Sequence, residues 1–325
     1  MTGTIRILAT GGTIAGKSGS PLERDYRPGQ ISIRAFIGQA ADLGVEAVLE
    51  GEQIANIGSE NIGPDIWKLL HERCLAALAD PECAGLVITH GTDTAEETAF
   101  LLDLTLPTAK PVVVVGAMRA ADAVGSDGLR NFANAVRVAG DADSAGRGVL
   151  LVMSDRVLSA RDARKARTTG TDAFAGYPRT AIAAVAPQSL EWFGAPWRVK
   201  EEARYPFPAR FPEVAVILAV AGMSAKPVTQ AVEGGAKGIV VAGFGDGNMP
   251  DAVRLELAAA ARAGVPVVRA SRTDEGLVDR EREDDANGFV AARALGPAKA
   301  RILLQLLIAD GVTEASAIQR EFDRR

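Results

Sequence analysis

The sequence predicts an α/β fold with mostly parallel sheets. Short apolar runs alternate with amphipathic stretches along the chain, which is the order of strands and helices in such folds. Most of these runs are unbroken rather than alternating, as is typical of strands that helices cover on both faces. The chain has 325 residues, of which 47% are hydrophobic, so it is long enough for two domains with a core in each.

The strands are expected at the apolar runs. In chain order these are residues 4–10, 85–90, 111–117, 148–153, 213–220, 238–243 and 266–271. Two of the intervening helices can be placed from their first turns. Pro64 suits the first turn of a helix, and apolar residues then recur on one face from Trp67 to Leu78. Thr94 and Glu97 have the T-x-x-E spacing of a capping box, which predicts a second helix after Thr94.

The alternation of strands and helices breaks between residues 187 and 212. This segment holds five of the 16 prolines and shows neither a strand period nor a helix period. Such a composition is typical of a connection between domains. We therefore place a larger α/β domain at residues 1–190, a linker at 191–212 and a smaller α/β domain at 213–325.

Composition and charge argue against several classes of protein. The 36 Lys and Arg against 41 Asp and Glu leave a net charge of −5 without a block of like charge, so no nucleic-acid partner is expected. No stretch approaches about 18 uninterrupted apolar residues, so no membrane span is expected. Two cysteines and two histidines are too few for a Cys-rich or multi-His metal centre, and no metal or cofactor is expected. The N-terminus lacks a signal-peptide core, which favours the cytoplasm, although a periplasmic chain with its leader removed would look the same.

Residues 11–18 match the phosphate-loop pattern G-x-x-x-x-G-K-[ST] and follow an expected strand. In a phosphate loop the Lys and Ser open a helix whose N-terminal amides face the phosphates. Here the chain continues with Gly19, Pro21, Pro28 and Gly29 and has no apolar period, so no helix is expected to follow. We therefore interpret the match as accidental.

Two turns rich in hydroxyl groups follow expected strands, at residues 9–16 and 89–98. Each turn alone is interpreted as a tight strand-to-helix connection that needs glycine. The second turn sets Thr92 and Asp93 just before a helix N-terminus, where amide groups favour developing negative charge. Ligands of open α/β sheets bind outside the carboxyl ends of the strands, so both turns point to one crevice.

Taken together, the two turns closely resemble the two signature segments of the bacterial L-asparaginases, including the glutaminase-asparaginases. The matching segments are ILATGGTIAG (7–16) and GLVITHGTDTAEETA (85–99). The resemblance continues in the same order through residues 51–62, 110–128, 147–168, 237–248 and 288–306, and so covers nearly the whole chain. It implies two α/β domains, the larger N-terminal one flavodoxin-like. It also implies an amidohydrolase that converts L-asparagine to L-aspartate and ammonia without a metal or cofactor.

The resemblance implies five catalytic residues. The family's first signature carries a threonine that attacks the side-chain amide and forms an acyl-enzyme, and the matching residue is Thr13. Tyr26 falls where the family has a tyrosine on a mobile loop beside this nucleophile. The second signature supplies Thr92 and Asp93, and RDARKAR supplies Lys165, so a hydroxyl pairs with an amine that can accept its proton. The sequence leaves open whether Thr13 or Thr92 attacks first, and we assign the attack to Thr13.

The resemblance also implies how the amino-acid end of the substrate is bound. Ser59 matches the serine that hydrogen-bonds the substrate carboxylate, and Asp93 and Glu60 are expected to hold the α-ammonium group. Asparagine-preferring relatives tend to carry glutamine in place of Glu60, whereas relatives with dual specificity carry glutamate. A glutaminase side activity is therefore expected.

Further contacts to the ammonium group are expected from a neighbouring subunit, because the family assembles as a homotetramer of close dimers with sites at the dimer contact. Asn248 matches one of these contacts. The other is an acidic residue, and a difference in length in DREREDDANGF leaves open whether it is Glu281 or Glu283.

Two other functions are consistent with the same segments. One is a glutamine-dependent amidotransferase subunit that acts with a tRNA-linked partner, and the absence of a basic face weighs against it. The other is a non-catalytic amino-acid-binding protein, and the joint presence of the four residues Thr13, Thr92, Asp93 and Lys165 weighs against it.

The two histidines are expected to have no catalytic role. His90 closes an apolar strand and is interpreted as a structural hydrogen-bonding residue. His71 shares a helical face with Lys68 and Glu72 and is expected to be solvated.

Overall fold

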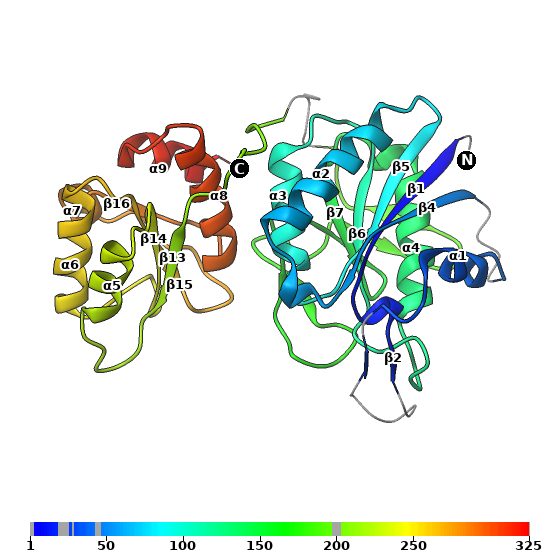
Figure 1. Ribbon diagram of the computed structural model, residues 1–325, viewed down its shortest axis with the longest axis horizontal. Helices are drawn as coiled ribbons and strands as arrows, with labels where there is room; N and C mark the ends of the chain where they lie inside the picture. Colours follow the sequence, from blue (N-terminus) through cyan, green and yellow to red (C-terminus); the bar gives the residue numbers. More distant parts are fainter. Residues whose placement is uncertain (1–2, 19–25, 28, 43–46, 197–202, 325) are drawn as a thin grey trace. The chain divides into compact units, whose positions relative to one another are not determined.

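The computed structural model describes residues 3–18, 26–27, 29–42, 47–196 and 203–324. The chain divides into two compact units, one ending at Arg204 and the other beginning at Tyr205 (Figure 1). This division falls inside the proline-rich segment, and the finer placement of a linker at 191–212 stays a prediction. In the described part of the chain, no helix has the length and apolar character needed to cross a membrane.

The first unit is built on an eight-stranded sheet with the order β12-β11-β8-β7-β6-β5-β1-β4. Its parallel strands are β1 (Thr4–Gly11), β4 (Val48–Ile57), β5 (Cys83–Thr89), β6 (Val112–Val115) and β7 (Val149–Met153). Counted in chain order, these five strands follow the spatial order 2-1-3-4-5, which is that of flavodoxin-like folds. The prediction of a flavodoxin-like N-terminal domain is confirmed.

Antiparallel strands extend this sheet beyond β7. They are β8 (Arg156–Ser159), β11 (Ala183–Val185) and β12 (Leu190–Trp192). Two short hairpins lie outside the sheet: β2 (Lys17–Ser18) with β3 (Tyr26–Arg27), and β9 (Ala163–Lys165) with β10 (Phe174–Gly176). Among the described residues of this unit are also the 3-10 helices η1 (Thr13–Ala15), η2 (Ser59–Asn61) and η3 (Ala142–Ser144).

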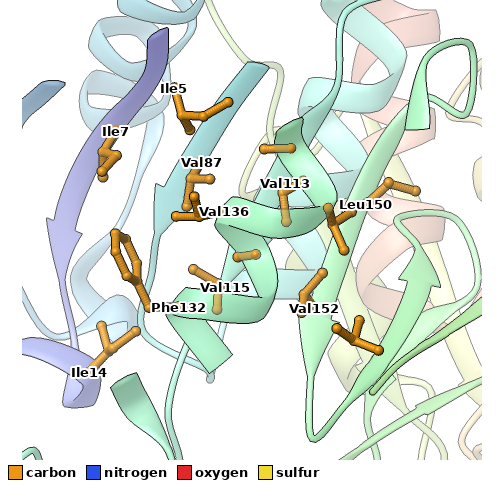
Figure 2. Close-up of a cluster of buried hydrophobic side chains, with 14 of the residues drawn as sticks. Ile5, Ile7, Ile14, Val87, Val113, Val115, Phe132, Val136, Leu150 and Val152 are labelled. Carbon is orange, nitrogen blue, oxygen red and sulfur yellow. The ribbon is translucent and has the colours of Figure 1, made fainter. Parts of the chain in front are cut away.

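Helices cover both faces of the parallel strands, which explains why the apolar runs are unbroken. On one face lie α1 (Ile33–Asp42) and α4 (Gly128–Gly140), and on the other α2 (Pro64–Ala79) and α3 (Ala95–Thr105) (Figure 1). Figure 2 shows Phe132 and Val136 of α4 against Val87 and Val113 of the strands. The neighbouring strand residues point to the opposite face and pack under α2 and α3.

Both helices that the sequence places are present, but the capping box is wrong. Thr94 is the N-cap residue of α3, and its side chain makes no capping hydrogen bond. The Thr94 hydroxyl instead donates to the backbone oxygen of Ser59 at 2.8 Å. The Thr94 hydroxyl therefore binds the segment after β4 instead of capping the first turn of α3, which is what the T-x-x-E spacing predicts.

The second unit is a four-stranded parallel sheet with helices. Its strands, in spatial order, are β13 (Val214–Leu218), β14 (Gly238–Gly243), β15 (Val267–Ser271) and β16 (Phe289–Ala291). Its helices are α5 (Lys226–Glu233), α6 (Asp251–Arg262), α7 (Arg282–Asn287), α8 (Pro297–Ala309) and α9 (Ala315–Asp323). Helices α5 and α6 lie on one face of the sheet and α8 on the other (Figure 1). The predicted α/β class with mostly parallel sheets is confirmed in both units.

Candidate active site

The site lies where the strand order of the first unit reverses direction. From β1 the chain passes to its outer neighbour β4, whereas from β5 it passes to β6 on the other side. In open α/β sheets, ligands bind outside the carboxyl ends of the strands at such a switch point. The turn after β1 carries Thr13 in η1, and the turn after β5 carries Thr92; both side chains are buried.

Glycines allow these two turns to touch. Gly12 has φ +80°, and a Cβ added there would lie 2.4 Å from the Cα of Gly91. A Cβ on Gly116, which follows β6, would lie 2.9 Å from the Cγ2 of Thr92. Such gaps leave room only for hydrogen, so the backbones are in direct contact. Thr13 and Thr92 therefore lie on adjoining turns, as the sequence predicts.

Segment 11–18, the phosphate-loop match, forms η1 followed by the short strand β2. No helix begins at Lys17 or Ser18, so their backbone amides do not form the phosphate cradle that the pattern needs.

Lys165 reaches the second turn from β9. Its Nζ donates to the Thr92 Oγ1 at 2.9 Å and forms an ion pair with the Asp93 carboxylate. The Lys165 side chain is largely buried, whereas that of Asp93 is exposed. The structure thus brings three of the five residues assigned to catalysis into one hydrogen-bonded cluster.

Glu96 anchors this cluster and was missed by the sequence analysis. Its Oε2 accepts the backbone N–H of Lys165 at 2.6 Å, which ties β9 to the first turn of α3. In sequence, Glu96 looks like an ordinary acidic residue at a helix N-terminus, where its negative charge interacts favourably with the helix dipole. Its partner lies 69 residues away, so no local pattern indicates the contact.

Ser59 adjoins the same turn from the end of β4. Its Oγ accepts the backbone N–H of Asp93 at 3.2 Å, and a Cβ on Gly91 would lie 2.7 Å from this Oγ. The Ser59 side chain is buried. Glu60, the next residue, is exposed, and its carboxylate lies against Gly58 and accepts from the Asn61 amide at 3.2 Å.

The backbone of Tyr26 lies in β3, paired with Ser18 of β2. The backbone N–H of Ser18 donates to the Asp122 carboxylate at 2.8 Å, which fixes the base of the hairpin to the segment after β6. The side chain of Tyr26 and residues 19–25 lie outside the described residues.

The other predicted site residues belong to the second unit. Asn248 is exposed and closes the turn after β14, where it exchanges two backbone hydrogen bonds of 2.7 Å with Phe244. Glu281 is the N-cap residue of α7 and forms a capping box with Asp284. Glu283 is exposed and forms an ion pair with Arg254 at 3.3 Å.

The two histidines are both buried. His90 lies behind the second turn with its Nδ1 2.7 Å from the backbone oxygen of Gly91, and burial lowers its pKa to about 4. Its expected structural role agrees with this contact. The expectation for His71 is wrong: it is buried rather than solvated, its Nε2 lies 3.2 Å from the Thr105 oxygen, and burial lowers its pKa. The helical face that it shares with charged residues also packs against α3.

The described residues contain no group of three or more His, Cys, Asp or Glu side chains that could hold a metal ion. Thr13 and Thr92 contribute two buried hydroxyls to the site, beside the Lys165 amine and the exposed Asp93 carboxylate. A lysine in contact with a hydroxyl can exchange a proton with it, which is one way to activate an otherwise weak nucleophile.

Comparisons with known proteins cover both units. Residues 4–198 match the family model described as asparaginase, N-terminal, and residues 213–322 match that of the glutaminase/asparaginase C-terminal domain. A probable periplasmic L-asparaginase of Haemophilus influenzae is 40% identical, over 98% of this chain and 92% of the relative. A glutaminase-asparaginase of Pseudomonas fluorescens is 36% identical, over 97% of this chain and 89% of the relative. The crystal structure of a probable cytoplasmic L-asparaginase of Campylobacter jejuni superposes with a TM-score of 0.92 at 34% identity, covering 98% of this chain and 99% of that one.

Proposed function

The chain belongs to the asparaginase family, and from this premise we propose that it hydrolyses the side-chain amide of free L-asparagine to give L-aspartate and ammonia. The observation that carries the proposal is the Thr92–Lys165–Asp93 cluster, which lies beside Thr13 at the switch point of the sheet. Hydroxyl, amine and carboxylate meet there, and neither cysteine competes as a nucleophile, because both are buried elsewhere, in α2 and at the start of β5.

In the proposed reaction, the Thr13 oxygen attacks the carbonyl carbon of the side-chain amide. The proton of the hydroxyl passes to the amide nitrogen, the carbon–nitrogen bond breaks, and ammonia leaves an aspartyl ester on Thr13. Water then attacks the ester, the bond to Thr13 breaks, and the hydroxyl regains a proton. We assign the transfer of protons to the Thr92–Lys165 pair, whose 2.9 Å contact supports this role, and to Tyr26.

We assign the recognition of the amino-acid end to residues around the second turn. The buried Ser59 hydroxyl is proposed to bind the carboxylate, while the exposed Asp93 and Glu60 carboxylates attract the α-ammonium group. Asn248 and either Glu281 or Glu283 of a neighbouring subunit complete the site in a homotetramer of close dimers. We also propose a cytoplasmic location. The comparisons do not distinguish it from the periplasm, because relatives named as periplasmic and as cytoplasmic both match the chain.

The Thr13→Ala variant tests the reaction. Release of ammonia from asparagine should fall to background, while binding of aspartate, followed by calorimetry, should largely persist. If Thr13→Ala keeps its activity and Thr92→Ala loses it, the assignment of the nucleophile is wrong. If the unmodified protein binds aspartate without releasing ammonia, the non-catalytic alternative holds, and tRNA-stimulated release from glutamine would favour the amidotransferase.

We also propose a glutaminase side activity, supported by Glu60 and by the family's glutaminase-asparaginase members. One methylene in a substrate is worth only about 1–3 kcal/mol of discrimination, so one residue at the pocket edge can set the preference. Glu60→Gln should lower the rate on glutamine relative to asparagine. A rate on glutamine below about a hundredth of that on asparagine in the unmodified protein would contradict the proposal. A hundredfold difference is about 2.7 kcal/mol, near the upper end of that discrimination, and is typical of a site selective for one of the two amides.

A further inference from the structure

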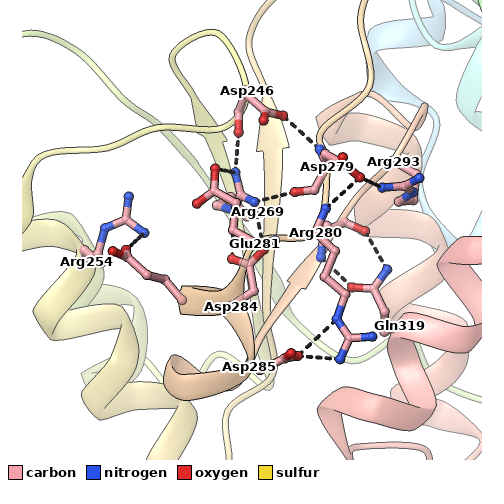
Figure 3. A network of polar contacts seen from close by, with 12 residues as sticks. Asp246, Arg254, Arg269, Asp279, Arg280, Glu281, Asp284, Asp285, Arg293 and Gln319 are labelled. Atoms are coloured by element: carbon pink, nitrogen blue, oxygen red, sulfur yellow. Dashed lines mark hydrogen bonds and ion pairs between the residues drawn. The ribbon is translucent and has the colours of Figure 1, made fainter.

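A buried ion pair lies at the centre of the second unit. Arg269 of β15 and Asp284 of α7 are both 0% exposed, and the guanidinium binds the carboxylate through two bonds (Figure 3). The Arg269 Nε donates to the Asp284 Oδ1 at 2.9 Å, and the Nη2 donates to the Oδ2 at 2.7 Å. This two-pronged geometry needs arginine, because lysine offers a single charged point.

The remaining N–H groups of Arg269 bind two separate loops. Its Nη2 donates to the backbone oxygen of Asp279 at 2.6 Å, and its Nη1 donates to the backbone oxygen of Asp246. The Glu281 carboxylate lies 3.8 Å from the Nη1. One guanidinium therefore joins the turn after β14 to the segment that leads into α7.

The two loops are also joined directly. The Asp246 Oδ1 accepts the backbone N–H of Asp279 at 2.8 Å. A Cβ on Gly247 would lie 2.8 Å from the Arg269 Cγ, so the turn that ends at Asn248 rests on the arginine stem. The turn after β14 and the segment 279–281 thus form one cross-linked unit.

The buried ion pair is better explained by the positions that it fixes than by a contribution to the free energy of unfolding. Removing two charges from water costs about as much as their attraction returns, so apolar residues of similar size would stabilise a core equally well. What an apolar core cannot do is hold two backbone oxygens and a carboxylate at fixed positions. The Arg269–Asp284 pair is therefore expected to fix the positions of the residues that these loops carry.

The loops carry two of the predicted substrate contacts. Asn248 ends the first loop, and Glu281 ends the second, where its backbone N–H donates to the Asp284 carboxylate at 2.8 Å. Glu283 is held differently: its 68% exposed side chain pairs with Arg254 of α6, outside this network. The network distinguishes the two acidic candidates that the sequence leaves open.

We propose that Arg269, paired with Asp284, is a positioning residue that presents Asn248 and Glu281 together to the α-ammonium group of the amino-acid substrate. The proposal rests on the proposed function and assigns the second contact to Glu281 instead of Glu283. Arg269 itself touches neither substrate nor reacting atoms in this scheme. Its effect therefore belongs to recognition of the ammonium group and leaves the chemical step nearly unchanged.

The Arg269→Lys variant tests this role, with Arg254→Lys as its matched control. Both are the same change to an arginine that pairs with an acidic residue of α7. For Arg269→Lys, the KM for asparagine should rise about tenfold or more, as expected when a hydrogen bond to a charged group is lost, while kcat changes little. Preference for asparagine over an analogue that lacks the α-amino group should fall by the same factor. Arg254→Lys should leave KM and preference unchanged.

A second variant covers the case in which Arg269→Lys does not fold. Asp246→Ala keeps the buried pair but removes the direct link to the backbone N–H of Asp279. It should shift KM and preference in the same direction, with unchanged oligomeric state on gel filtration. Loss of preference is the decisive readout, because a general loss of stability would affect both substrates equally.

The positioning role is overturned if folded Arg269→Lys and Asp246→Ala proteins keep the unmodified preference, or if Arg254→Lys loses it. Failure of the proposed function gives a different result. In that case the unmodified protein itself does not release ammonia from asparagine, or Thr13→Ala does not abolish the release.

Discussion

The Lys165 Nζ lies between a hydroxyl and a carboxylate, in contact with Thr92 and Asp93. Its backbone is fixed separately, by the Glu96 carboxylate. The position of the amine thus depends on three contacts, two with the turn after β5 and one with the first turn of α3. Removal of the Lys165 side chain should therefore lower the catalytic rate while the stability of the fold changes little.

The Lys165→Met variant should lower kcat about a hundredfold to ten-thousandfold, the range typical for the loss of a proton-transfer group. The melting temperature should change little, because the pair with the exposed Asp93 carboxylate contributes only about 0–1 kcal/mol. Lys110→Met is the control. Lys110 donates to the backbone oxygens of Leu78 and Asp80 and precedes β6, at the opposite end of the strands, so its loss should affect stability alone. Equal losses of kcat in both variants would contradict the role of Lys165.

His90 supplies a pH dependence of stability. Burial lowers its pKa from 6.5 to about 4 in the folded protein, so the unfolded chain binds the proton first as the pH falls. The free energy of unfolding should therefore decrease between pH 6.5 and 4, by about 1.4 kcal/mol per pH unit and roughly 3 kcal/mol in total. His71 shifts in the same direction, so the two contributions must be separated.

The His90→Asn variant makes this separation, because an asparagine amide can still donate to the Gly91 oxygen and His71 is unchanged. Denaturant unfolding at about pH 6.5, 5.5 and 4.5, one unit apart and enough to resolve the slope, measures the difference. The slope attributed to His90 should disappear in the variant. Parallel pH profiles of the two proteins would show that His90 is not its source.

Motifs predict the residues to which a resemblance assigns a role, and they fail for residues whose role appears only in their contacts. Thr13, Thr92 and Lys165 stand in recognisable segments, and the contact of Lys165 with Thr92 agrees with their assignment. Glu96 and Arg269 act through partners that only the fold brings near them, so neither could be predicted.

At the element scale, the site depends on the contact between the turns after β1 and β5. Strands β1 and β5 were predictable because both of their faces are buried and their apolar runs are unbroken. Strand β4, which brings Ser59 to the site, was not predicted. It is the edge strand of the sheet, none of its residues is fully buried, and polar residues interrupt its apolar ones, so the sequence lacks the apolar run.

The Gly12→Ala variant tests the contact between the turns. The added Cβ would lie 2.4 Å from the Gly91 Cα, and the backbone φ of +80° is unfavourable for alanine. The turns must separate, so kcat/KM should fall at least about tenfold, and stability should fall by about 1–3 kcal/mol. Gly38→Ala in α1 is the matched control: its Cβ would meet nothing within 4 Å, and it should stabilise the helix by about 0.5–1 kcal/mol. Unchanged kcat/KM in Gly12→Ala would show that the two turns need not touch.

At the scale of the whole molecule, the proposed site residues are divided between the two units. Thr13, Thr92 and Lys165 belong to the first unit, and Asn248 and Glu281 to the second. The sequence predicts both folds because each repeats the pattern of strand and helix. The assembly is predicted only through the resemblance to the family, because no local pattern indicates which copy of the chain supplies the second unit's residues to a site.

Co-expression of two damaged chains tests the assembly. In a close dimer of a Thr13→Ala chain with an Asn248→Ala chain, one site combines an intact Thr13 with an intact Asn248 from the partner. Random pairing makes half of the dimers mixed, with one intact site in two, so about a quarter of the unmodified activity should return. Activity measured at low substrate concentration should thus exceed the sum of the two variants expressed alone. Thr13→Ala with Lys165→Met is the control, because both changes fall in the first unit and no arrangement of two such chains contains an intact site. Absence of restoration in the test pair would mean that each chain completes its site with its own second unit. Restoration in the control would mean that Thr13 and Lys165 of one site come from different chains.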